Sequence, residues 1–274
     1  METREWNKLW YHPQLNIESY QAVCIKRGFP LHMHDYFVIC LIEEGMQKFI
    51  HRKINYLTPP GGLIILNPED AHTGEPADEY GFEYRALYPT VAHMQEAIHE
   101  LTGKWQNPPY FSRVRIDDAE LSAAVRALHV SLITETLPIE RETLFLTVIT
   151  KLVTQYAHQH LTPLAPKKER AAINKACCFI HDHVSKGITL TGLANHVGLS
   201  RYYFLRVFRE EMGMPPYTYL ESVRISRAKQ LLEKGATLTD AAMELGFSDQ
   251  SHFTNCFKRF IGITPGQYAL EIKK

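Results

Sequence analysis

The pattern of apolar positions along the chain changes near residue 90. Before it, short apolar runs rich in aromatic and β-branched residues recur, as at 36–42 (YFVICLI) and 63–66 (LIIL). Turn-forming residues separate these runs, including Gly45 and the stretch 59–62 (PPGG). Regularly spaced short strands with turn signals predict a β-sandwich or barrel over about residues 15–90.

After residue 90 the apolar positions follow helical spacing, over 91–102, 117–134 and 140–160. In the last of these segments, apolar residues recur every three or four positions between residues 144 and 156. The resulting stripe is wide for a single surface helix. This apolar face could pack against the barrel or form the interface of a dimer, and the sequence pattern alone does not decide between these two locations.

A stretch with two prolines and a basic cluster, 161–170 (LTPLAPKKER), follows the last of these helices. This composition is typical of a linker, which we place at residues 163–170. Beyond it the pattern is helical throughout. The predicted fold is therefore an α+β multidomain protein, with a β-barrel and appended helices in residues 1–162 and an all-α domain in residues 171–274.

The all-α part contains an internal repeat. Residues 194–200 (ANHVGLS) match 242–248 (AMELGFS), and the matches continue into a second helix in each copy. Each copy is predicted to be a helix capped by Thr189 or Thr191, or by Thr239, then a turn with glycine, then another helix. Two helices joined by such a turn form the DNA-binding helix-turn-helix, whose second helix enters the major groove.

The segment 216–234 between the two copies predicts a single helix of 19 residues. At 1.5 Å per residue it is roughly 28 Å long. Successive major grooves on one side of B-DNA lie about 34 Å apart. A rigid helix of this length is suited to hold two recognition helices in adjacent grooves.

The charge distribution agrees with this assignment. Among 274 residues, 30 Lys and Arg balance 30 Asp and Glu. However, residues 1–166 carry 14 basic and 20 acidic side chains, and residues 167–274 carry 16 and 10. The zero net charge is thus the sum of about −6 and about +6, and such asymmetry indicates a basic half that binds nucleic acid.

Composition excludes several other classes of protein. With 45% hydrophobic and 22% charged residues, the chain resembles ordinary globular domains and not disordered ones. No apolar run approaches the roughly 18–20 residues of a membrane span, and the N-terminal segment lacks the apolar core of a signal peptide. The 5 cysteines include no C-x-x-C pair, which favours reduced thiols. We therefore expect a cytoplasmic protein.

The C-terminal pattern resembles the AraC/XylS family of bacterial transcription regulators over about residues 170–272. The resemblance rests on L-x-x-L-A-x-x-x-G-L-S from Leu190, on the stretch 208–232, and on A-x-x-x-G-F-S-D-x-S-x-F from Ala242 to Phe253. It implies that exposed residues of the two recognition helices read bases. These are Tyr202, Leu205 and Arg206 on the first helix, and Gln250, Ser251, Thr254 and Asn255 on the second.

The chemistry of these side chains agrees in part with base reading. Arg206 suits guanine, Gln250 and Asn255 suit adenine, and Thr254 suits a thymine methyl group. Arg224, in the middle helix, is interpreted as a structural ion-pairing residue. A further set is expected to contact phosphate, which positions the protein without specifying sequence: Ser200, Arg201, Arg209, Lys258 and Arg259.

Three histidines stand out in the N-terminal half: His32 and His34 in LHMHDYF, and His72 in NPEDAHTGEP. They resemble the two metal-binding motifs of the cupin barrel, but Val38 stands where that resemblance implies a glutamate ligand, and Pro76 stands at the expected asparagine. We therefore expect no metal, no cofactor and no catalytic residue.

The same segment resembles the cupin-like sensing domain that often precedes the AraC-type module. That resemblance implies a barrel that binds a small-molecule effector, followed by helices used for dimerisation. The candidate effector-binding residues are His32, His34, Tyr36, His72, Glu83 and Arg85. Arg85 and Glu83 are included because their opposite charges suit a zwitterionic or carboxylate ligand.

The leading hypothesis is an effector-controlled transcription regulator, an activator, that binds double-stranded DNA as a homodimer. The resemblance also implies RNA polymerase as a partner. Two alternatives stay open: a cupin-type metalloenzyme with a DNA-binding tail, and a ligand-independent regulator whose barrel serves only for dimerisation. Metal analysis and a thermal-shift screen of metabolites would separate these alternatives from the leading hypothesis.

Overall fold

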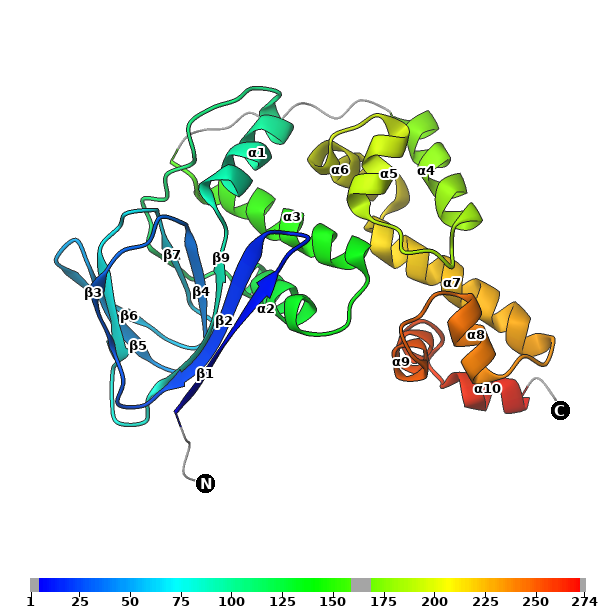
Figure 1. Cartoon of the computed structure of the whole chain (residues 1–274), viewed down its shortest axis with the longest axis horizontal. Helices are drawn as coiled ribbons and strands as arrows, with labels where there is room; N and C mark the ends of the chain where they lie inside the picture. The colour runs from blue at the N-terminus through cyan, green and yellow to red at the C-terminus, as the bar shows by residue number, and fades with distance from the viewer. Residues whose placement is uncertain (1–4, 159–168, 272–274) are drawn as a thin grey trace. The chain divides into compact units, whose positions relative to one another are not determined.

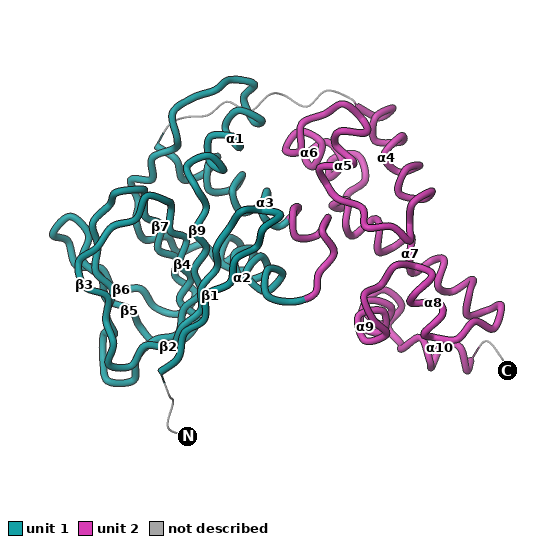
Figure 2. The backbone as a smooth tube through the Cα atoms, in the orientation of Figure 1, with its two compact units in different colours: residues 1–134, 144–164 teal, residues 135–143, 165–274 magenta. Residues whose placement is uncertain are grey.

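The structure is a computed structural model that describes residues 5–158 and 169–271. The chain divides into two compact units (Figure 2). The first comprises residues 1–134 and 144–164, and the second comprises residues 135–143 and 165–274. Of the predicted linker, residues 163–168 lie outside the described residues, and Arg170 already begins a helix.

The β-rich unit contains two antiparallel sheets, which face each other in Figure 1. The six-stranded sheet has the order β1-β2-β9-β4-β7-β10, and the four-stranded sheet has the order β3-β8-β5-β6. The predicted barrel is thus confirmed. The strands are β1 (Trp6–His12), β2 (Ile17–Cys24), β3 (Phe29–His32), β4 (Val38–Gly45), β5 (Gln47–His51), β6 (Ile54–Thr58), β7 (Leu63–Leu66), β8 (His72–Pro76), β9 (Phe82–Tyr88) and β10 (Arg115–Ile116).

Strand β4 is buried on both faces, which explains why its sequence is apolar without alternation. Cys40 and Ile42 face the interior between the sheets, where they join the hydrophobic core. Leu41 points to the opposite face and is also fully buried. Helix α2 (Ala119–Ile133) covers that face and contacts β4 and β9.

The apolar stripe of helix α3 (Pro138–Tyr156) is buried within a single chain. Its residues Val148, Leu152 and Val153 are fully buried. Phe145 contacts the His93 ring of helix α1 (Val91–Thr102), with ring centroids 5.2 Å apart. These residues are therefore buried within one chain and are not available as an exposed dimer surface, while packing of this stripe against the barrel stays a prediction.

Among the described residues of the second unit, all regular secondary structure is helical, as the sequence predicts. No helix in residues 5–158 and 169–271 is both long and apolar enough to cross a membrane. The helices are α4 (Arg170–Asp182), α5 (Leu190–Val197), α6 (Arg201–Met212), α7 (Pro216–Glu233), α8 (Leu238–Glu244), α9 (Gln250–Ile261) and α10 (Pro265–Glu271).

The pairs α5–α6 and α8–α9 form two helix-turn-helix units joined by α7, which is one residue shorter than predicted. Thr189 caps α5, since its hydroxyl accepts a hydrogen bond from the Gly192 amide at 2.9 Å. Thr237 caps α8 in the same way, through the Asp240 amide. The prediction of Thr239 as the cap is wrong, because Thr239 already lies within the first turn of α8.

Candidate nucleic-acid interface and ligand cavity

Helix α9 presents most of the predicted base-reading residues to solvent. Gln250, Ser251 and Asn255 are exposed and Thr254 is half-buried, whereas Phe253 and the other apolar positions form the buried side. The four polar positions cover about 140° of the helix, at 3.6 residues per turn. The structure thus brings them together on one face. The Asp249 carboxylate caps the helix by accepting from the His252 amide at 2.7 Å.

Helix α6 differs from the prediction. Tyr202 and Leu205 are each only 4% exposed, so they do not lie on an exposed face in this structure. Side chains that read bases must reach the groove, so these two residues would need a conformation that exposes them. Arg206 is partly exposed, and its guanidinium lies 5.6 Å from the centre of the Tyr203 ring.

The predicted phosphate-binding residues fall into two groups. Ser200, Arg209 and Lys258 are exposed, and Arg201 is half-buried. Arg259 is also exposed, at 57%, but it forms an ion pair with Glu221 of α7, whose side chain is only 3% exposed. Arg259 therefore neutralises a buried carboxylate, and the sequence does not reveal this because the two residues are far apart along the chain.

Arg224 is fully buried in the second unit and has a structural role. Its Nε donates to the Val184 carbonyl at 3.0 Å and its Nη2 to the Lys186 carbonyl at 3.4 Å. The guanidinium also lies 5.4 Å from the Phe247 ring centre. Burial lowers the pKa of Arg224 to about 10. The expected structural role is present, but backbone carbonyls take the place of the predicted ion-pair partner.

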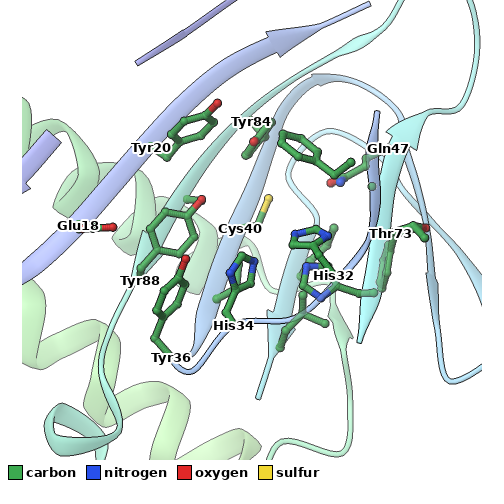
Figure 3. A pocket seen from close by; sticks show the side chains of 18 of the residues that line it. Glu18, Tyr20, His32, His34, Tyr36, Cys40, Gln47, Thr73, Tyr84 and Tyr88 are labelled. Carbon is green, nitrogen blue, oxygen red and sulfur yellow. The ribbon is translucent and has the colours of Figure 1, made fainter. Parts of the chain in front are cut away.

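The barrel of the first unit encloses a cavity of about 390 Å³ between its two sheets (Figure 3). Its polar lining consists of histidine and tyrosine side chains with Gln47, Thr73 and Cys40, and Glu18 is its acidic member. No lysine or arginine is among the described residues that line it. The cavity wall is therefore about half aromatic, histidines included, and it offers hydrogen-bonding groups without a fixed positive charge.

Four of the six predicted effector-binding residues line this cavity: His32, His34, Tyr36 and His72. Glu83 and Arg85 do not, and their prediction as cavity groups is wrong. Side chains alternate along a strand, and on β9 the cavity receives the other set, Tyr84, Ala86 and Tyr88. The sequence reasoning missed Tyr84 and Tyr88, although strict alternation along GFEYRALY was the signal.

Arg85 and Glu83 belong to a polar network outside the cavity. Arg85 donates to Glu43 at 2.7 Å and to the Gln21 side-chain oxygen at 3.1 Å. Its Nη1 also donates to Nδ1 of His129, a fully buried residue of α2. Burial and the neighbouring Arg85 lower the pKa of His129 to about 4, so its imidazole is neutral. This network fastens α2 to the sheet.

Gln47 is a cavity residue that the sequence reasoning also missed. Its side chain is 8% exposed, and its oxygen Oε1 has no hydrogen-bond partner among the residues that the structure describes. Its Nε2 lies over Gly74, where an added Cβ would come within 2.8 Å of it. A buried amide oxygen without a partner carries a free-energy cost that a bound donor would remove.

The three histidines gather on one wall of the cavity. Their ring centroids are 4.8 Å apart for His32 and His34, 4.4 Å for His32 and His72, and 5.3 Å for His34 and His72. Burial lowers the pKa of His72 to about 4, and burial also lowers the pKa of His34. Both rings are therefore neutral at pH 7.

Both halves of the chain match known protein families. Residues 17–149 match the AraC-like ligand binding domain, and residues 193–270 match a helix-turn-helix domain family. The HTH-type transcriptional regulator YbfI of Bacillus subtilis (strain 168) is 36% identical over 248 residues, which are 90% of each chain. The chain belongs to the AraC family of transcriptional regulators.

Two further proteins are similar to this chain at lower identity. The HTH-type transcriptional activator RhaS of Escherichia coli O81 (strain ED1a) is 26% identical over 246 residues, or 86% of each chain. Among solved structures, the C-terminal domain of AraT, a response regulator from Geobacillus stearothermophilus, is 26% identical, with a TM-score of 0.36. That match covers 36% of this chain and 84% of the other. As an AraC-type regulator, the chain is a DNA-binding protein with a ligand-binding domain.

Proposed function

We propose that this regulator is a transcription activator that reads a specific DNA sequence with two recognition helices. The observation that carries the proposal is the paired architecture: α5–α6 and α8–α9 begin with equivalent caps and are joined by one continuous helix. With 18 residues, α7 is roughly 27 Å long at 1.5 Å per residue. This length suits recognition helices in neighbouring major grooves about 34 Å apart.

Within this proposal, α9 reads bases through Gln250, Ser251, Thr254 and Asn255. An exposed amide can bond bidentately to adenine, and Thr254 can contact a thymine methyl group. Arg206 is the accessible candidate on α6, and Ser200, Arg201, Arg209 and Lys258 contact phosphate. Tyr202 and Leu205 contribute once they become exposed. The relative RhaS is named a transcriptional activator. Our proposal adds to this that the regulator acts as a homodimer and contacts RNA polymerase.

The barrel cavity is the proposed effector site. Support comes from its size, from its aromatic lining, and from the unpartnered Gln47 oxygen that a bound donor would satisfy. Effector binding would shift the protein between two states for which the effector has different affinities. A metabolite that binds should raise the melting temperature of the chain. If none of a broad metabolite set does so, the barrel acts as a scaffold only.

The base-reading assignment is tested by selecting bound sequences from a random DNA pool with the full chain. The Kd of the selected site is then measured for Gln250→Ala and Asn255→Ala, with Gln14→Ala as a control that removes an exposed amide from the first unit. Each base-reading amide contributes about 1–3 kcal/mol of discrimination, or roughly 5- to 150-fold in Kd.

Binding to unrelated DNA should stay the same in all three variants, because phosphate contacts carry it. The assignment fails if Gln250→Ala and Asn255→Ala bind the selected site as tightly as the unchanged chain. It also fails if both weaken specific and nonspecific binding equally, since that result describes a phosphate contact.

A further inference from the structure

The histidines of the cavity come from three adjacent segments that converge on one point. His32 ends β3, His72 begins β8, and the two residues are register partners in the four-stranded sheet. His34 follows β3 by two residues. One ring nitrogen from each of the three lies within 4.8 Å of the others, and all three residues line the cavity.

Two of the three rings are oriented by the backbone. His32 Nδ1 lies 2.7 Å from the Pro30 carbonyl, and His72 Nδ1 lies 2.9 Å from the Asp70 carbonyl. A carbonyl oxygen only accepts, so in both rings Nδ1 carries the proton and donates it. In a neutral imidazole this leaves Nε2 with a free lone pair. Metal-binding histidines use this arrangement, in which a backbone or carboxylate partner fixes the tautomer.

We propose that His32, His34 and His72 bind one divalent transition-metal ion through three imidazole nitrogens, with its remaining coordination position open to the cavity. Neutral imidazole suits borderline ions such as Zn²⁺, Co²⁺, Ni²⁺ and Fe²⁺. Ligand nitrogens about 2.0–2.1 Å from such an ion are closer together than 4.8 Å, so small rotations of the rings complete the site.

The missing carboxylate does not prevent such a site. Val38 occupies the position where a cupin-type glutamate would stand, and it lines the cavity as an apolar group. Sites with three histidines and an open fourth position bind zinc in other proteins. Without a carboxylate ligand, the ion keeps its full double charge. It would therefore supply the positive charge that the described cavity lining lacks, and favour an effector with an anionic oxygen.

This proposal extends beyond DNA binding and does not depend on it. The experiment uses the untagged full chain, because a histidine tag would itself bind these metals. After chelator treatment and dialysis, Zn²⁺ and Co²⁺ binding are measured by calorimetry, and the metal content is measured by elemental analysis. The expected result is one ion per chain, a raised melting temperature, and a visible Co²⁺ spectrum unlike that of the hydrated ion.

The matched variants are His34→Ala, His72→Ala and the control His99→Ala. His99 lies in α1, and its ring stacks on the ring of Trp105. His34→Ala and His72→Ala should weaken binding by at least about ten-fold, and His99→Ala should bind as the unchanged chain does. The half-buried His34 is the decisive position, because melting without metal shows whether that variant stays folded.

Binding of less than one ion per chain, or equal binding by His34→Ala and the unchanged chain, would overturn the proposal. The metal-free chain is assayed for DNA binding in parallel. Specific DNA binding without metal binding refutes only the metal site. Metal binding without specific DNA binding refutes only the proposed function.

Discussion

Arg85 donates a hydrogen bond from Nε to the Glu43 carboxylate at 2.7 Å, on the face of the six-stranded sheet that α2 covers. Arg126 of α2 also donates to both oxygens of that carboxylate. The side chains of Arg85 and Glu43 are 18% and 14% exposed. Burial alone would raise the pKa of Glu43, but hydrogen bonds from Arg126 and Arg85 outweigh it and lower the pKa.

Replacing Glu43 should therefore destabilise the β-rich unit. Glu43→Gln leaves the Arg85 charge largely buried without its partner, which typically costs about 3 kcal/mol of unfolding free energy. The neighbouring Glu44 is exposed, so Glu44→Gln should change stability by at most about 0.5 kcal/mol. Urea unfolding of both variants measures the difference, and equal losses would show that the carboxylate contributes little.

The two helix-turn-helix units should respond differently to the same substitution in their turns. Gly198 and Gly246 both adopt left-handed backbone, with φ of 73° and 71°. An added Cβ at Gly198 meets nothing within 4 Å, whereas at Gly246 it would lie 2.5 Å from the Ser185 carbonyl oxygen. Gly198→Ala should cost only the left-handed strain, about 1–2 kcal/mol.

Gly246→Ala should cost clearly more than Gly198→Ala, because the backbone near Ser185 must also shift, and with it the hydrogen bonds of Arg224. Thermal unfolding of the two variants side by side tests this order. Equal losses would mean that the second unit relaxes without resistance around the new methyl group.

Lys258 and Arg259 are adjacent but should have different functions. Lys258 is exposed at the end of α9, and Arg259 pairs with the buried Glu221. Lys258→Ala should weaken binding to all DNA sequences alike and reduce the salt dependence, the slope of log K against log salt, by about 1. Arg259→Ala should instead lower the melting temperature, because it leaves the Glu221 carboxylate buried without a cation.

These two outcomes are measured by DNA titrations at several salt concentrations and by thermal unfolding. If Arg259→Ala changes the salt slope while the melting temperature stays constant, Arg259 contacts phosphate, as the sequence predicts. A loss of stability in Lys258→Ala would contradict its assignment as an exposed phosphate contact.

Asp118 should make stability dependent on pH at acid values. Burial would raise its pKa, but hydrogen bonds from Tyr156, from the Leu121 amide and from Lys151 outweigh this and lower the pKa from 3.8 to about 2. A carboxyl group with a lowered pKa contributes stability above its unfolded pKa and loses it as pH falls through the folded value. The contribution at pH 7 is about 2 kcal/mol.

Asp118→Asn keeps a good helix cap while it removes the charge. The variant should be about 2 kcal/mol less stable than the unchanged chain at pH 7, and the difference should shrink between pH 4 and pH 2. Urea unfolding across this pH range measures it, with the exposed Asp117→Asn as control. A difference that does not depend on pH would assign the effect to packing.

The elements of the fold follow closely from local sequence signals. Helix α1 begins and ends at the predicted residues 91 and 102, and β7 at the predicted residues 63 and 66. The repeat identified Gly198 and Gly246 as helix ends because left-handed backbone favours glycine. Thr237 lies 48 residues after Thr189, which is the offset of the repeat. The repeat therefore indicates Thr237 as the helix cap, whereas cap propensity alone also allowed Thr239.

The site was less predictable because it depends on contacts between distant residues. The charge of Arg85 suggested that it binds a ligand. Only the structure shows that its guanidinium donates hydrogen bonds to Glu43, Gln21 and His129 instead. Likewise, the burial of Tyr202 and Leu205 depends on tertiary packing that helix periodicity does not contain. The histidines were found from their motif, since H-x-H spacing places both rings close together.

Alternate side chains of strand β9 have different roles and are therefore subject to different constraints in evolution. Tyr84, Ala86 and Tyr88 form cavity wall, whereas Arg85 fastens the sheet to its covering helix. Substitutions at even positions can therefore change which ligand is accepted while the scaffold stays fastened, and substitutions at odd positions are constrained by folding. A single-residue insertion in this strand would exchange the two roles, so relatives with new specificities should differ here by replacement and not by length.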